Sequence, residues 1–121
     1  MNIKLGIIGV GFVGSAMLKS FKSKNINVKA YDKYKEFDNF ISCLETDIIF
    51  LCLPTEFDYE EKEFNKSIIY DICQDIQNNN YKGLIVLKST VEPLSTKELS
   101  KKFTSLNFVY NPEFLSQDTA F

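Results

Sequence analysis

Six residues near the N-terminus, GVGFVG at positions 9–14, have the spacing of a phosphate-binding turn. They leave an apolar run and open a segment with helical spacing, which is the context that a G-x-G-x-x-G motif requires. In such a turn Gly9 permits the tight bend, Gly11 lets a diphosphate approach the backbone, and Gly14 lets the helix pack closely. The backbone amides of Phe12 and Val13 would then face the phosphates at the positive end of the helix dipole.

An acidic residue follows at the distance that a dinucleotide site needs. Asp32 ends the second apolar run, eighteen residues after Gly14. A carboxylate at this place accepts hydrogen bonds from both ribose hydroxyls of the adenosine half and repels a 2′-phosphate. The motif and the acid together predict NAD, and not NADP, as the cofactor. The structural alternative is that the glycines only form a turn and that Asp32 caps the next segment.

The elements that must position these residues alternate along the chain. Five short apolar runs of strand length are rich in β-branched and aromatic residues, and their nearly continuous hydrophobicity is typical of strands buried on both faces of a parallel sheet. They cover residues 3–10, 26–32, 47–53, 83–89 and 107–110.

Helical segments are predicted between these runs, at 12–23, near 36–44, at about 60–78, and from Pro93 onward. The helix at 60–78 is the clearest, because its apolar residues share one stripe at helical spacing. Those residues are Phe64, Ile68, Ile69, Ile72, Cys73 and Ile76. Strand–helix alternation predicts an α/β fold, a Rossmann-type three-layer sandwich with a mostly parallel sheet of about five strands, in one domain over residues 1–121.

Composition excludes several classes of function. The net charge is −2 and the basic residues are all lysine, so the chain lacks the clustered positive field that nucleic acids and anionic membranes require. Cys43, Cys52 and Cys73 are scattered, without the spacing of a metal site, and are typical of reduced thiols in a cytoplasmic protein. The alternative for the N-terminal apolar stretch, a signal peptide, is disfavoured by the glycines that interrupt it and by the lack of a cleavage site.

Three further motifs stand where the later predicted strands end: LPTE at 53–56, KSTVEP at 88–93 and YNPEFL at 110–115. With GxGxxG and Asp32 they form an ordered set that resembles the N-terminal, NAD-binding domain of the UDP-glucose/GDP-mannose dehydrogenases. The resemblance extends essentially from Met1 to Phe121. Members of that family oxidise C6 of a nucleotide sugar twice, from alcohol to acid, with two NAD per turnover.

The resemblance implies roles for residues at these strand ends. Leu53, Pro54 and Thr55 would line the cofactor groove, and Thr90 would sit beside the nicotinamide and the reacting carbon. Glu113 would belong to the catalytic pocket and handle protons or an ordered water during thioester hydrolysis. The structural alternatives are a strand-end hydroxyl before a turn for Thr90 and a helix-start acid beside Pro112 for Glu113.

The chain also departs from the family pattern. Gln117 and Asp118 stand where members usually have a second glutamate and a glycine, and only the fourteen residues of 33–46 separate the second and third predicted strands, where members often have an extra edge strand. The family's nucleophilic cysteine, its catalytic lysine and aspartate, and its UDP-binding domain lie beyond the matched segment. A fragment, a truncated gene and a compact variant all fit this pattern.

Three interpretations of function remain at this point. The first is the NAD-binding domain of a nucleotide-sugar 6-dehydrogenase whose activity depends on missing or separate parts. Its expected partners are a nucleotide-sugar substrate and either a second copy of the chain, in a homo-oligomer, or a docked C-terminal domain. The second is a stand-alone dinucleotide-binding or interaction module. The third is another oxidoreductase of the same fold, such as a relative of 6-phosphogluconate or hydroxyacid dehydrogenases, against which KST and NPEFL argue.

Overall fold

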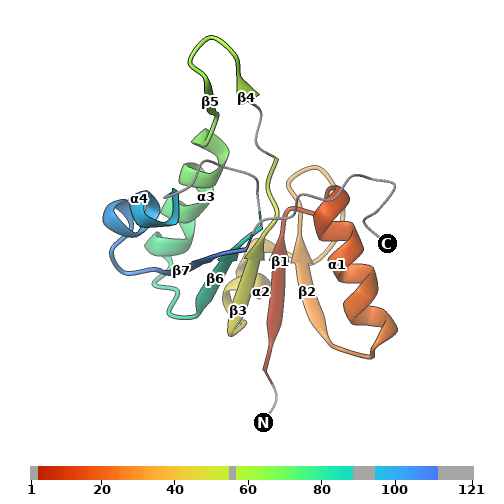
Figure 1. Ribbon diagram of the computed structural model, residues 1–121. Coiled ribbons are helices and arrows are strands. Elements are labelled where there is room, and N and C mark those ends of the chain that lie inside the picture. The colour runs from red at the N-terminus through yellow and green to blue at the C-terminus, as the bar shows by residue number, and fades with distance from the viewer. Residues whose placement is uncertain (1–2, 55–56, 89–94, 112–121) are drawn as a thin grey trace.

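A five-stranded parallel sheet forms the centre of the protein (Figure 1). The structure, a computed structural model, describes residues 3–54, 57–88 and 95–111. The strand order is β2-β1-β3-β6-β7, and every pair of neighbours is parallel. The strands are β1 (Leu5–Ile8), β2 (Val28–Tyr31), β3 (Ile48–Leu51), β6 (Leu84–Leu87) and β7 (Asn107–Tyr110). The predicted fold class is confirmed, and each of the five apolar runs contains one strand of this sheet.

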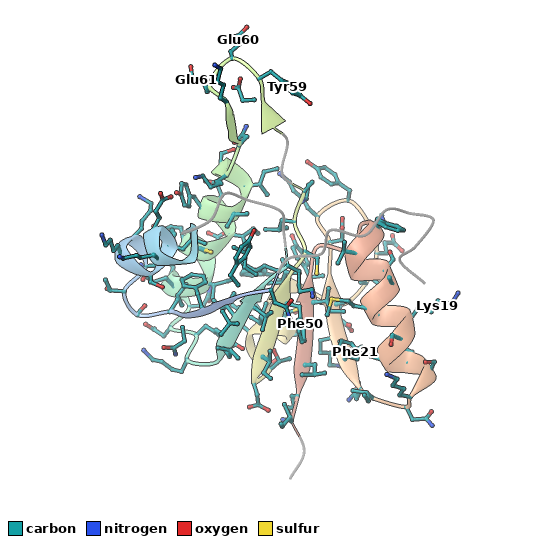
Figure 2. All side chains as sticks on the ribbon, in the orientation of Figure 1. Lys19, Phe21, Phe50, Tyr59, Glu60 and Glu61 are labelled. Atoms are coloured by element: carbon teal, nitrogen blue, oxygen red, sulfur yellow. The ribbon has the colours of Figure 1, made fainter. Side chains whose placement is uncertain are left out.

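Helices cover both faces of the sheet, which gives the three layers that the sequence predicts. One face carries α1 (Phe12–Ser23), whose Leu18 is buried with residues of β1 and β2. Figure 2 shows Phe21 of α1 beside Phe50 of β3, with 5.8 Å between ring centroids. The opposite face carries the other three helices, which share one buried cluster with β3 and β6. These helices are α2 (Phe40–Leu44), α3 (Ser67–Asn78) and α4 (Ser95–Lys102).

The predicted helix over 60–78 is wrong in its first part. Residues 57–64 form a small antiparallel hairpin of β4 (Phe57–Asp58) and β5 (Glu63–Phe64), and α3 begins only at Ser67. The physical reason is local turn chemistry, because the Asp58 carboxylate accepts hydrogen bonds from the N–H groups of Glu60 and Glu61. Figure 2 shows the hairpin tip, with Tyr59, Glu60 and Glu61, standing away from the rest of the molecule.

The connection between β2 and β3 is short and contains only α2. Asn39 caps this helix by accepting a hydrogen bond of 2.8 Å from the N–H of Ser42, and Cys43 packs beneath it with no exposed surface. No strand lies in residues 33–46, all of which the structure describes, so β2 is an edge strand of the sheet. This agrees with the expectation that the extra edge strand of many family members has no room here.

The carboxyl ends of all five strands lie in register. Ile8 pairs with Tyr31 and Leu51, and Leu87 pairs with Leu51 and Tyr110. The next residue of each strand therefore falls in a second row, which we call the carboxyl edge. Backbone hydrogen bonds of 2.8–2.9 Å continue the sheet into this row. Its residues are Asp32, Gly9, Cys52, Lys88 and Asn111.

Candidate functional site: a dinucleotide-binding cavity

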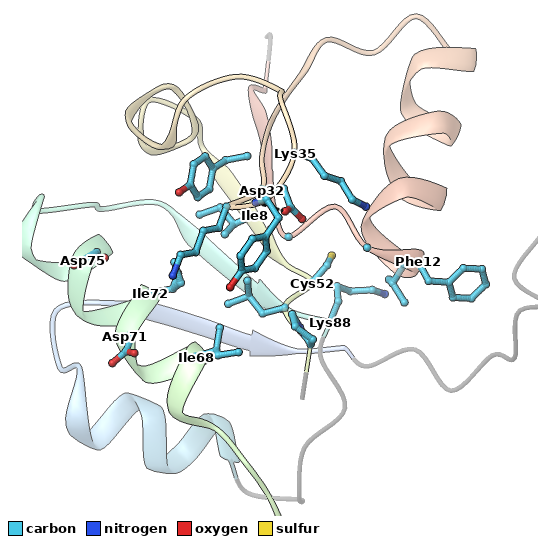
Figure 3. Close-up of a pocket in the computed structure, with 18 residues that line it drawn as sticks. Ile8, Phe12, Asp32, Lys35, Cys52, Ile68, Asp71, Ile72, Asp75 and Lys88 are labelled. Carbon is cyan, nitrogen blue, oxygen red and sulfur yellow. Dashed lines mark hydrogen bonds between the residues drawn. The ribbon is translucent and has the colours of Figure 1, made fainter. Parts of the chain in front are cut away.

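A cavity of about 780 Å³ opens at the carboxyl edge (Figure 3). Open parallel α/β sheets bind their ligands at this edge, in the crevice beyond the strand ends. Four parts of the chain form the walls, namely the glycine turn, the loop after β2, the ends of β3 and β6, and one face of α3. The lining residues in these parts are Gly9, Gly11, Phe12, Val13, Asp32, Lys33, Tyr34, Lys35, Cys52, Leu53, Pro54, Ile68, Asp71, Ile72, Asp75 and Lys88, together with Ile8 and Tyr31.

The glycine turn fits its surroundings only with glycine at two of its three positions. Gly9 has a φ of +96°, and a Cβ on it would lie 2.7 Å from the carbonyl oxygen of Cys52. A Cβ on Gly14 would collide with the carbonyl oxygen of Gly9, so the close approach of α1 to the turn depends on this residue. Gly11 differs, because a Cβ there would meet nothing within 4 Å and would project into open space at the cavity wall.

Asp32 is fixed by the backbone on both sides. Its Oδ2 accepts a hydrogen bond of 2.7 Å from the N–H of Val10, and its Oδ1 accepts one of 2.9 Å from the N–H of Tyr34. The side chain therefore does cap the following turn, as the structural alternative holds. An ionised carboxylate has about four acceptor positions, so both oxygens keep acceptor capacity for a further ligand. The carboxylate also lines the cavity, and capping and ligand binding are compatible here.

Two lysines at the same rim were missed by the sequence analysis. Lys33 and Lys35 line the cavity on either side of Tyr34, and the ammonium of Lys35 donates a hydrogen bond of 2.5 Å to the carbonyl oxygen of Val10. The chain has no arginine, yet positive charge does lie next to Asp32. The sequence did offer one indication of these lysines, because they stand one and three residues after Asp32. The loop that carries them is folded back by a bridge between Asp32 and Lys35.

The apolar residues of α3 occupy two faces of the helix, one of which forms a wall of the cavity. Ile69, Cys73 and Ile76 are buried against the sheet, while Ile68 is 48% exposed and borders the cavity. Ile72 shares the cavity face, and the single stripe predicted from the sequence therefore divides into a core face and a ligand face. Asp71 and Asp75 lie three residues after Ile68 and Ile72 and line the same wall. This face offers apolar contact together with carboxylate acceptors.

The other predicted site residues divide into two groups. Leu53 and Pro54 line the cavity beside the turn, as the family resemblance implies for the cofactor groove. Thr55, Thr90 and Glu113 lie outside the described residues.

The cysteines are buried. Cys52 is 9% exposed, and its Sγ lies 3.8 Å from Sδ of Met17 in the core under α1, although it also reaches the cavity wall. Burial raises the pKa of Cys43 to about 11, with Asp38 adding to the effect, and burial raises the pKa of Cys73 to about 12. Cys43 and Cys73 therefore stay protonated at neutral pH, and a protonated thiol is a poor nucleophile.

Among the described residues, no helix is long and apolar enough to cross a bilayer.

Two curated relatives of this chain are UDP-glucose 6-dehydrogenases. The UDP-glucose 6-dehydrogenase of Campylobacter jejuni subsp. jejuni serotype O:2 is 27% identical over 150 residues, which cover 98% of this chain and 38% of that protein. The UDP-glucose 6-dehydrogenase of Streptococcus pneumoniae is 30% identical over 70 residues, or 58% of this chain and 18% of that protein. The chain thus spans about two fifths of the length of the first of these relatives.

Solved structures share the fold. A UDP-glucose dehydrogenase from the hyperthermophilic archaeon Pyrobaculum islandicum superposes with a TM-score of 0.73 at 18% identity, over 96% of this chain and 37% of that one. A 3-hydroxyisobutyrate dehydrogenase from Mycobacterium tuberculosis gives a TM-score of 0.76 at 14% identity, over 98% of this chain and 43% of the other. At these identities the likeness shows the fold alone, so it does not choose between the two enzyme classes.

The family is decided by its sequence profile. The profile described as the UDP-glucose/GDP-mannose dehydrogenase family, NAD binding domain, matches residues 34–121, which is well over half of the chain. The match begins just after Asp32, so the glycine turn and the acid support the same conclusion independently of it. The chain therefore belongs to the UDP-glucose/GDP-mannose dehydrogenase family and is an NAD-binding domain of that family.

Proposed function

We propose that this chain is the cofactor-binding part of a nucleotide-sugar 6-dehydrogenase and that NAD binds in the cavity at the carboxyl edge. The observation that carries the proposal is the arrangement of Asp32 against the glycine turn. One hydrogen bond from the N–H of Val10 holds the carboxylate at the turn, beside the place where a diphosphate would approach Gly11. Ribose recognition and phosphate recognition are thereby brought to one wall of one cavity.

The cavity residues offer contacts for the adenosine and diphosphate parts of the dinucleotide. The adenine ring packs against Ile68 and Ile72 on the α3 wall, where an exposed isoleucine gains an apolar contact. The adenosine ribose donates its hydroxyls to Asp32, and the diphosphate lies across Gly11 at the N-terminus of α1. When bound, NAD supplies a hydride acceptor for the oxidation of an alcohol carbon.

The nicotinamide then extends past Leu53 and Pro54 toward the end of β6. In this proposal Thr90 positions the nicotinamide and the reacting carbon, and Glu113 holds or moves a proton for the attacking water. Both residues follow from the family resemblance. The substrate of the whole protein is a nucleotide sugar such as UDP-glucose or GDP-mannose, and a cytoplasmic location fits the three free cysteines.

These 121 residues alone are proposed to bind NAD without oxidising the sugar. The second oxidation requires an activated cysteine at the substrate carbon, and the raised pKa values of Cys43 and Cys73 leave both thiols unsuited to that role. Isothermal titration of the purified chain with NAD tests the first statement, and spectroscopic detection of NADH after addition of UDP-glucose and NAD tests the second. Absence of NAD binding would refute the proposal, NADH production would contradict the second statement, and two NADH formed per sugar would in addition require a nucleophile within the chain itself.

A further inference from the structure

A large aromatic side chain stands exposed at the rim of the cavity. Tyr34 lines the cavity, and 86% of its surface is exposed. Apolar ring surface is stabilised by removal from water, so a ligand that covers this ring gains free energy. Among the exposed large apolar residues in the described part of the chain, Ile68 of α3 is the other one that lines the cavity. The cavity therefore offers exposed apolar surface on two of its walls.

The backbone of Tyr34 is held by the carboxylate that is proposed to bind the ribose. Its N–H donates a hydrogen bond of 2.9 Å to Oδ1 of Asp32, and the bridge between Asp32 and Lys35 closes the turn around it. In a nucleoside the base is attached to the carbon next to the one that bears the 2′-hydroxyl. A ribose bound to Asp32 therefore brings its base to the turn that carries Tyr34.

The Tyr34 ring keeps one face for a flat ligand. The ammonium of Lys33 lies over the ring, 5.7 Å from its centroid, in a cation–π contact on one face. Across the cavity from Asp32, Figure 3 shows Ile68 and Ile72 on α3, and both residues line the cavity. A flat ring placed between the turn and α3 would have an aromatic surface on one side and apolar side chains on the other.

We propose that Tyr34 is a cofactor-binding residue, whose ring stacks on one face of the adenine while Ile68 and Ile72 pack against the other face. The inference rests on the proposed binding of NAD in this cavity and adds the aromatic partner of the adenine. Stacking on an aromatic side chain contributes to the affinity for a base without any hydrogen bond to its edge. Affinity for the adenosine half of NAD should therefore depend on Tyr34.

The charges on the turn favour the adenine over the other flat ring of NAD. The nicotinamide of oxidised NAD carries a positive charge, whereas the adenine is neutral. Lys33 and Lys35 flank Tyr34, and Asp32 supplies one negative charge against their two positive charges. The turn is thus positive on balance, and like charges repel each other. The nicotinamide is therefore disfavoured at this end of the cavity.

The test compares ligands that contain one half of the cofactor or the other. Tyr34→Ala removes the ring, Tyr34→Phe keeps it, and Tyr59→Ala is the matched control, because Tyr59 is 84% exposed at the hairpin tip (Figure 2). In Tyr34→Ala the affinities for NAD, ADP-ribose and adenosine should each fall about five- to a hundredfold, the range for the loss of one base–aromatic stack. Nicotinamide mononucleotide should bind both proteins equally. Tyr34→Phe should keep nearly the full affinity, and Tyr59→Ala should lose none.

Two further measurements separate stacking from a structural role. At saturation, the NMR signals of the adenine ring protons should move upfield on binding to the unmodified chain, because the ring current of Tyr34 shields them, and this displacement should shrink in Tyr34→Ala. The midpoint of thermal unfolding without ligand should be nearly unchanged in Tyr34→Ala, because substitutions of exposed residues usually alter stability little.

The possible outcomes distinguish this inference from the proposed function. Unchanged affinity of Tyr34→Ala for adenosine and ADP-ribose would overturn the inference and leave the binding of NAD intact. A loss confined to nicotinamide mononucleotide would overturn it by placing the other ring at this turn. An equal loss for every ligand, with a lower unfolding midpoint, would show a structural role and overturn it as well. A chain that binds adenosine through Tyr34 but does not bind NAD would support the inference and refute the proposed function, and a chain that binds neither would refute both.

Discussion

The carboxylate of Asp32 and the backbone N–H of Val10 are joined by a hydrogen bond of 2.7 Å across the mouth of the cavity. The contact links residues that are 22 positions apart, and it couples the end of β2 to the glycine turn after β1. Because the acid is fixed at the turn, a ribose hydroxyl bound to Asp32 and a phosphate bound at Gly11 are held in a defined relation. Cofactor choice should therefore depend on this one carboxylate.

The first prediction concerns that choice. NADP should bind the unmodified chain at least about tenfold more weakly than NAD, because Asp32 opposes the extra phosphate and no arginine offsets it. Asp32→Ala should narrow the difference in affinity between NAD and NADP, mostly by weakening the binding of NAD. The nearby Lys33 and Lys35 should then favour the 2′-phosphate of NADP. Asp32→Asn is the matched control, since it keeps an acceptor for Val10 without the charge. Titration calorimetry measures the affinity of each of the three proteins for both cofactors, and equal affinity of the unmodified chain for the two cofactors would exclude the assignment.

The second prediction contrasts two glycines of the same turn. Gly11→Ala should fold with nearly unchanged stability, since its Cβ meets nothing within 4 Å, but the methyl group would occupy the path of the diphosphate. Gly14→Ala should lose about 3 kcal/mol or more of unfolding free energy, because its Cβ would collide with the carbonyl oxygen of Gly9. Urea unfolding and NAD titration of both variants provide the comparison. A Gly11→Ala protein that binds NAD normally would show that the diphosphate lies elsewhere.

Much of the fold follows from the sequence for a physical reason. Strands such as β1, β3 and β6 are buried on both faces, so their hydrophobicity is nearly continuous and distinguishes them from the amphipathic helices. The hairpin at 57–64 was not predictable in this way, because Phe64 continues the spacing of the α3 residues and masks the turn at Asp58. Local hydrogen bonds to the Asp58 side chain decide the conformation there, and periodicity does not report them.

Site residues that belong to a sequence motif were predicted, whereas residues that only the three-dimensional fold brings to the cavity were missed. The glycines and Asp32 have a fixed spacing that reflects one turn and one strand. Lys88 reaches the cavity wall because β6 lies next to β3, so the ends of these two strands meet at the same edge. The ligand face of α3 was likewise hidden, since Ile68 and Ile69 are indistinguishable by residue type and differ only in which wall they meet.

The third prediction follows from the buried thiols. Their pKa values in the folded protein, about 11 for Cys43 and about 12 for Cys73, exceed the ordinary value of 9.0. The unfolded chain therefore loses these protons at lower pH than the folded one. The protonated thiols therefore contribute fully to the stability of the folded protein below about pH 9. This contribution is lost progressively as the pH rises through the pKa values of the thiols in the folded protein. Urea unfolding between about pH 7 and pH 10.5 should show falling stability, and Cys73→Ala, though less stable at neutral pH, should show a shallower fall.

Thiol labelling provides an independent check on the same property. Cys43 and Cys73 should react with a soluble disulfide reagent only slowly in the native state and rapidly in urea, because burial withholds both the thiolate and access to it. Rapid labelling of either residue in the folded protein near neutral pH would contradict the cause assigned to the raised pKa values. Lys35→Met, which alters an exposed residue of the loop after β2, should label at the unmodified rate.

The last prediction concerns β7 at the edge of the sheet. Within residues 3–54, 57–88 and 95–111, β7 pairs with β6 alone, and its Val109 is 44% exposed. Edge strands are usually protected by charge, proline, a bulge or a covering element. The opposite edge strand, β2, carries the exposed Lys29, whereas Asn107–Tyr110 contains no charged residue. We therefore expect self-association through this edge, or docking of a further domain there, when the pure chain is studied at micromolar concentration.

A charge on the exposed side of β7 should abolish that association. Val109→Lys places an ammonium where two β7 edges would meet, and sedimentation should then show a monomer where the unmodified chain shows a dimer or larger species. Ile41→Lys is the matched control, because Ile41 is 53% exposed on α2, which packs against β1 and β2 at the side of the sheet opposite β7. Association that survives Val109→Lys but disappears with Ile41→Lys would place the interface on the α2 side. A strictly monomeric unmodified chain would show that the edge is already protected.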